Sequence, residues 1–175
     1  GELLNRLLPH LEQADDEIND RLMGGRVLGR SRITTRLRLV LLPDRERWRM
    51  GLEAQGNVNS RTHTKRGPAR FHNAGRSRYL VRKLLLIDRR GIHTGDAEGS
   101  ASTNANLTRM ETDLDGVPLV NLLVRSIARQ MYDRDAPTAE DQAEGMVASR
   151  ARARLDQEVD QQLSDATHKF RREIW

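Results

Sequence analysis

The chain contains no cysteine and very few aromatic residues. Of its 175 residues, none is cysteine and only 3% are Phe, Trp or Tyr. The absence of cysteine excludes disulfide bonds, thiolate nucleophiles and zinc sites with thiolate ligands. The apolar fraction of 37% is also below the share usual in globular domains. Together these shortages predict a thin hydrophobic core that covers one face of a sheet.

Long apolar runs and lysine are scarce as well. No apolar run approaches the roughly 18 residues that a membrane-spanning helix requires, so no transmembrane segment is predicted. Three of the 30 basic residues are lysine, so 27 are arginine, a bias that arginine-rich codon usage would also produce. Arginine is better suited than lysine to flat bidentate contacts with carboxylate or phosphate groups.

The net charge of +5 hides an uneven distribution. Residues 1–20 carry a net charge of −5, residues 21–95 carry +15, and residues 96–175 carry −5. A strongly basic middle segment between acidic flanks predicts a partner or a covering segment of opposite charge.

Three segments in the middle of the chain alternate between apolar and basic residues. They are residues 31–42, 47–66 and 69–88. In the first segment, Ile33, Leu37 and Leu39 alternate with arginines, which predicts a strand with two different faces. In the third segment, Lys83 is the charged exception within the apolar set. The pattern predicts three neighbouring antiparallel strands, with a fourth around residues 101–110.

The flanking segments read as helices. Residues 9–23 place Leu11, Ile18 and Leu22 near one stripe, and glycines follow, so we expect a helix there. Two further helices are expected at residues 116–133 and 138–174, separated before Pro137. Val117 to Ala128 is apolar nearly all round, which predicts that this helix is buried. The prediction is therefore a single α+β domain spanning residues 1–175. Its long antiparallel sheet of three to four strands, at residues 30–110, packs on one face against helices, including the long C-terminal one.

One face of the predicted sheet is rich in arginine, and we call it the arginine face. Glu53 is the only acid expected on this face within the three strands, opposite Arg36. Three interpretations stay open: a solvated outer face, a face covered by the acidic flank at Glu12, Asp15, Asp16, Glu17 and Asp20, or a docking site for an anion. The candidate anion-binding residues are Arg36, Arg38, Arg47, Arg49, Arg61, Arg70, Arg76, Arg78 and Arg82.

Other functional classes find little support. Nucleic acid is an unlikely anion because Trp48, Phe71 and Tyr79 fall on the opposite, core-facing side and offer no stacking platform. His63 and His72 share one face but have no third ligand nearby, so we predict no metal site and no cofactor. No nucleophile has a neighbouring base, so no catalytic residue is predicted. An enzyme ranks behind the binding functions as an alternative.

Two stretches carry a resemblance. "GLEAQGNVNSRTHTKRGPARFHNAGRSRYLVRKLLLIDRRGI" and "TDLDGVPLVNLLVRSIA" resemble a group of uncharacterised, exported bacterial proteins over residues 20–175. The resemblance implies export to the periplasm and supplies no activity or functional residue. We therefore expect a non-catalytic binding or structural module of the bacterial envelope. Its partner would be an anionic polymer, a lipid headgroup or an acidic protein surface.

Two alternatives concern the overall plan of the chain. Long strands beside a long helix are also similar to tubular lipid-binding domains, although Ser60, Thr62 and Thr64 make half of the inner face polar. A lipid-binding domain is therefore the alternative function. The similar segments "EINDRL" and "EVDQQL" further suggest one module cut from a longer repeat protein.

Overall fold

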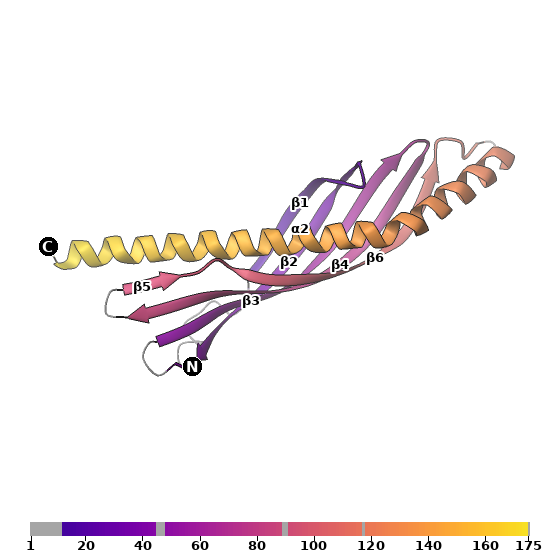
Figure 1. The fold of residues 1–175 in the computed structure, drawn as a ribbon. Coiled ribbons are helices and arrows are strands. Elements are labelled where there is room, and N and C mark those ends of the chain that lie inside the picture. Colours follow the sequence, from indigo (N-terminus) through magenta and orange to yellow (C-terminus); the bar gives the residue numbers. More distant parts are fainter. Residues whose placement is uncertain (1–11, 45–47, 89–90, 117, 175) are drawn as a thin grey trace.

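A curled antiparallel sheet and one long helix make up the fold, shown in Figure 1. The computed structural model describes residues 12–44, 48–88, 91–116 and 118–174. The sheet forms a half-barrel, and the helix runs along its concave side. The elements are β1 (Glu12–Leu22), β2 (Gly25–Leu42), β3 (Trp48–Arg66), β4 (Ala69–Asp88), β5 (Gly91–Thr94), β6 (Glu98–Thr112) and α2 (Pro118–Ile174).

The strands follow one another in the sheet in the order β1-β2-β3-β4, and both β5 and β6 pair with β4. Every pairing is antiparallel, which confirms the predicted α+β class and the antiparallel sheet. The prediction of three to four strands was wrong, because the described residues already form six strands in this sheet. The strand expected near residues 101–110 is β6, and β5 extends the same edge along β4.

The first described element is a strand, so the helix predicted at residues 9–23 was wrong over residues 12–22. Residues 9–11 lie outside the described residues. Ala14, Ile18 and Leu22 recur every four residues, a spacing that fits one face of a helix and one face of a strand equally well. The glycines close a tight hairpin, in which Met23 and Gly24 have φ angles of 50° and 73°.

The predicted alternation of the three middle strands is confirmed by their pairing. Val58 lies opposite Ile33 and Ser77, so the apolar and small residues share one side. Glu53 lies opposite Arg38, however, and not opposite Arg36 as predicted. The connection between β2 and β3 is two residues longer than the expected turn. A shift of two residues keeps every side chain on its predicted face.

One continuous helix, α2, replaces the two helices predicted at residues 116–133 and 138–174. Pro137 lies inside it, where a proline removes one backbone hydrogen bond and bends the helix without ending it. Figure 1 shows the bend in the orange part of α2, the part that contains Pro137.

The hydrophobic core lies between the C-terminal half of α2 and the middle of the sheet. Val81 is fully buried and packs with Tyr79 and Ala54 from the sheet. Leu155 and Val159 of α2, which lie four residues apart on one side of the helix, complete this cluster.

Lys83 points into this core and is only 3% exposed. Its Nζ atom lies 2.5 Å from Oδ1 of Asp156 and 3.5 Å from Oδ1 of Asp160. Burial alone would lower the pKa of Lys83, but the hydrogen bond and the charge of Asp156, with Asp160 behind it, raise that pKa above its ordinary value. Lys83, the charged residue within the apolar set, therefore forms an ion pair that links β4 to α2.

Candidate functional site

A cavity of about 680 Å³ lies between α2 and the concave face of the sheet. This volume falls within the range of about 300–1,000 Å³ that is typical of small-molecule and cofactor sites. All of the strands except β5 contribute to its wall.

The cavity exists because small residues face each other across it. On α2, Ala136, Ala139 and Ala143 face the sheet at intervals of three and four residues. On β4, Gly75 and Ser77 lie on the opposite wall. Large side chains fill the same layer on both sides of the hollow: Leu155 and Val159 farther along α2, and Phe71 stacked on Tyr132 toward its start. The cavity therefore results from small residues on both α2 and β4.

Tyr79 closes the cavity on the side of the core. Its ring lies over Gly56, where an added Cβ atom would come within 2.3 Å of the ring. Its hydroxyl lies 2.6 Å from Oγ1 of Thr35, within hydrogen-bond distance. Glycine at position 56 therefore allows the ring to lie across β3 and reach β2.

Several polar groups of the wall are already paired. The Tyr132 hydroxyl donates to Oδ1 of Asn73 at 2.8 Å. Burial, and then the charges of Glu140 and Asp133, raise the pKa of Tyr132. The Thr103 hydroxyl donates to Oγ of Ser77 at 2.9 Å. An apolar ligand can therefore contact Tyr132 and Thr103 without depriving their hydroxyl groups of a hydrogen-bond partner.

The seam between α2 and β6 is closed by hydrogen bonds from backbone amides of the strand to side-chain carboxylates of the helix. The backbone N–H groups of Thr103 and Ala105 donate to Glu144 and Glu140 at 2.7 Å and 2.8 Å. These amides face away from β4, so the carboxylates of α2 satisfy the free edge of the sheet. The N–H of Ala97 donates to Asp156 at 3.0 Å and extends the same seam toward the core.

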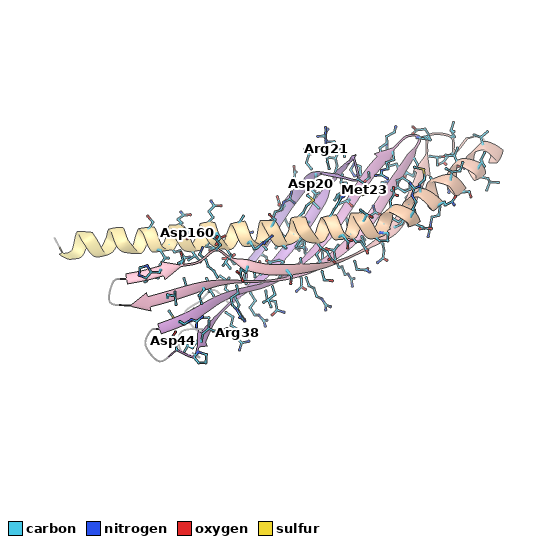
Figure 2. The ribbon with its side chains drawn as sticks, viewed as in Figure 1. Asp20, Arg21, Met23, Arg38, Asp44 and Asp160 are labelled. Atoms are coloured by element: carbon cyan, nitrogen blue, oxygen red, sulfur yellow. The ribbon has the colours of Figure 1, made fainter. Side chains whose placement is uncertain are left out.

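The seam between α2 and β1 differs from the β6 seam, because most of its contacts are ion pairs between side chains. Arg150 lies 2.6 Å from Asp20, and Arg154 lies 3.8 Å from Glu12. The N–H of Met23 donates to Gln142 at 3.2 Å. Both arginine side chains are more than half exposed, so each ion pair contributes little to stability. Figure 2 shows Asp20 and Met23 together at the hairpin end of β1.

A third ion pair lies near the turn between β3 and β4. Nη1 of Arg66 lies 2.8 Å from Asp135 of α2, and both residues line the cavity. Arg66, with Arg134 beside it, lowers the pKa of Asp135.

The arginine face lies on the convex side of the sheet, away from the cavity. Strand pairing puts all of its described arginines on this side, and Figure 2 shows Arg38 on the side away from α2. Arg47 lies outside the described residues. Three of the predicted residues have acidic partners: Arg49 with Asp44 at 3.8 Å, Arg70 with Glu111 at 3.8 Å, and Arg82 with Glu53.

The remaining arginines of this face have no carboxylate within salt-bridge distance among the residues that the structure describes. They are Arg36, Arg38, Arg61, Arg76 and Arg78. Sequence reasoning missed Arg30, which lies directly opposite Arg61 as a like-charged pair. Asn57 and Asn59 lie opposite Arg78 and Arg76, so hydrogen-bond donors are interleaved with the charges.

The acidic N-terminal flank does not cover these arginines within the described part of the chain. Asp15 pairs with Arg32 at 3.0 Å, at the margin of the face. Glu12 and Asp20 instead pair with α2 on the concave side. This arrangement favours the open interpretations, solvation or anion docking, over the covering one.

His63 and His72 lie opposite each other, with ring centroids 6.1 Å apart. In residues 12–44, 48–88, 91–116 and 118–174, no group of three acidic or histidine side chains could hold a metal ion. Over the same residues, no helix combines the length and the hydropathy needed to cross a membrane.

Sequence reasoning did not find the cavity. The available signal was the run of alanines at helical spacing before the leucine and valine stripe of the same helix. Comparison with protein-family models, curated proteins and solved structures gives no match to this chain.

Proposed function

We propose that this chain is a non-catalytic binding module that holds an elongated apolar ligand, of the acyl-chain type, in the cavity under α2. The observation that carries the proposal is the shape of the cavity. Its wall follows β4 from Ala69 to Tyr79, a distance of about 33 Å at 3.3 Å per residue. A volume of about 680 Å³ over that length gives a mean cross-section of about 20 Å². That section suits one extended hydrocarbon chain.

The polar inner residues of β3 are compatible with such a ligand. Ser60 and Thr62 are small, and α2 supplies the apolar wall across from the sheet through Ile127, Ala128 and Met131. In the sequence alone, these hydroxyl groups were an argument against lipid binding. The apolar wall that α2 supplies opposite them becomes visible only in the structure.

Filling the cavity tests the proposal. The double substitution Ala139→Phe and Ala143→Phe places two rings in the hollow, and we expect at least about a tenfold loss of affinity for a fluorescent fatty acid, equal to 1.4 kcal/mol. Ala153→Phe is the matched control, because Ala153 is exposed on the same helix. Native mass spectrometry of the purified protein should also show a bound acyl-chain ligand that the double variant lacks. Equal binding by the double variant and the control would contradict the proposal.

The arginine face supports a second candidate function, docking of an anionic partner. Within the described part of the chain, five guanidinium groups on this surface have no carboxylate within salt-bridge distance, and Arg61 faces the like-charged Arg30, which has Glu17 opposite it on β1. A polymer with regularly spaced phosphate or carboxylate groups would relieve this repulsion through bidentate contacts. A location in the bacterial envelope and a longer repeat protein stay predictions from the sequence.

Charge reversal tests this second candidate. The triple substitution Arg61→Glu, Arg76→Glu and Arg78→Glu should lower the affinity for polyphosphate by at least about tenfold. The affinity of the native chain should fall with added salt, because surface charges are screened. The control is Arg125→Glu, Arg129→Glu and Arg134→Glu, which changes net charge equally at arginines of α2 that are at least 43% exposed. Equal losses in both variants would show that net charge alone attracts the polymer.

A further inference from the structure

The first turns of α2 expose a group of large apolar side chains. The sequence predicted that this part of the helix is buried, and that prediction was wrong: Leu122 is 68% exposed and Leu123 is 63% exposed. Asn121 and Ala128 face the sheet in these turns, so the exposed leucines lie on the part of the helix surface that the sheet does not cover. We call this surface the apolar stripe; it consists of Val120, Leu122, Leu123, Ile127 and Met131.

The apolar stripe is continuous with the cavity. Ile127 and Met131 belong to both, since they line the cavity and remain partly exposed. Val124 and Ala128 line the cavity from the same turns of α2. An apolar chain could therefore move from the stripe into the cavity without crossing a polar barrier on this helix.

Basic side chains accompany the stripe. Arg129 and Arg134 are 61% and 72% exposed. Their carboxylate neighbours are exposed or shared, so these pairs can be exchanged for other anions at little cost. Long arginine side chains beside apolar ones are typical of helices that lie in the headgroup region of an anionic bilayer.

We infer that the apolar stripe docks on a lipid membrane that carries anionic headgroups, with Leu122 and Leu123 inserted below the headgroups. The mouth of the cavity then faces the bilayer that supplies its ligand. The identity of that ligand rests on the proposed function, whereas the docking of the stripe is tested separately.

Vesicle flotation tests the inference. The full chain is mixed with vesicles of equal parts phosphatidylcholine and phosphatidylglycerol, and we expect it to float with them. Leu122→Ser with Leu123→Ser should lower the bound fraction at least about tenfold, because two inserted leucines are lost. Leu41→Ser with Leu80→Ser is the matched control, since both leucines are about half exposed on the sheet. This control should bind as the native chain does.

Three results overturn the inference. The first is failure of the native chain to bind the vesicles, and the second is equal binding by the stripe variant (Leu122→Ser with Leu123→Ser) and the control variant. The third is a native dimer in solution that dissociates only in the stripe variant. Uptake of a fluorescent fatty acid in the absence of vesicles separates the two proposals. The stripe variant should keep that uptake. If neither the native chain nor the stripe variant takes up the fatty acid, the proposed function fails while the docking result still stands.

Discussion

Cross-linking α2 to β1 is expected to slow exchange of the bound ligand. With no native cysteine in the chain, the pair Asp20→Cys and Arg150→Cys can be joined selectively by a short bismaleimide. If the next available route costs about 3 kcal/mol more, exchange of a fluorescent fatty acid slows about a hundredfold, because 1.4 kcal/mol is tenfold. The rate is measured by displacement with unlabelled fatty acid.

The reason lies in the difference between the two seams of α2. The β6 seam combines hydrogen bonds to the backbone with the apolar core near Leu155. The β1 seam depends on ion pairs whose arginine side is open to water, such as Arg150 with Asp20, so solvent weakens them. Separating α2 from β1 therefore costs least, and Asp20 and Met23 already line the cavity there.

A second cross-link serves as the matched control. Thr103→Cys with Glu144→Cys joins α2 to β6, and exchange should continue near the rate of the same variant before cross-linking. Salt should speed exchange in the native chain, because it screens the ion pairs of the β1 seam. Equal slowing by both cross-links would contradict entry at β1, since it would mean that any restraint of α2 blocks exchange.

The sheet was largely predictable because strand alternation is a local signal. Arginine and apolar residues alternate through β2, β3 and β4. Because every second residue of a strand points to the same face, this alternation placed the described arginines on the correct face. The same method failed for β1, because the spacing of Ala14, Ile18 and Leu22 is shared by helices and strands. Only pairing with β2 distinguishes the two structures.

The cavity and the apolar stripe were not predictable in the same way, because both depend on how closely the sheet approaches α2 and which side of the helix it covers. Ala139 can face a partner at close range or a hollow, depending on whether the sheet curls away from it. Leu122 is exposed because the sheet contacts these turns of α2 through Asn121 and Ala128, which lie on a different side of the helix. Pro137 misled the prediction for a similar reason, since a proline ends some helices and only bends others.

Removing the acidic partner of Lys83 is expected to destabilise the fold. In Asp156→Ala, the ammonium group of Lys83 stays buried with only Asp160 nearby, at 3.5 Å. Breaking a buried ion pair on one side costs about 3–5 kcal/mol, and we expect about 2–3 kcal/mol in the free energy of unfolding because Asp156 is itself partly exposed. Asp160→Ala is the control and should cost less than about 1 kcal/mol, because the Asp160 side chain is mostly exposed.

The pH dependence of Asp156→Ala distinguishes the buried charge from a general packing defect. In the native chain, the pKa of Lys83 is raised, so the pair's contribution is complete below 10.5 and is lost as the pH rises through the higher folded pKa. Without Asp156, burial dominates and lowers the folded pKa, so the unfolded chain binds the extra proton. The variant should then gain stability as the pH rises toward 10.5. Urea denaturation over a pH series measures both slopes.

Adding Lys83→Met to the variant should restore much of the lost stability and flatten its slope, because no buried charge remains. A double variant as unstable as Asp156→Ala alone would instead place the loss in the bond between Asp156 and the N–H of Ala97.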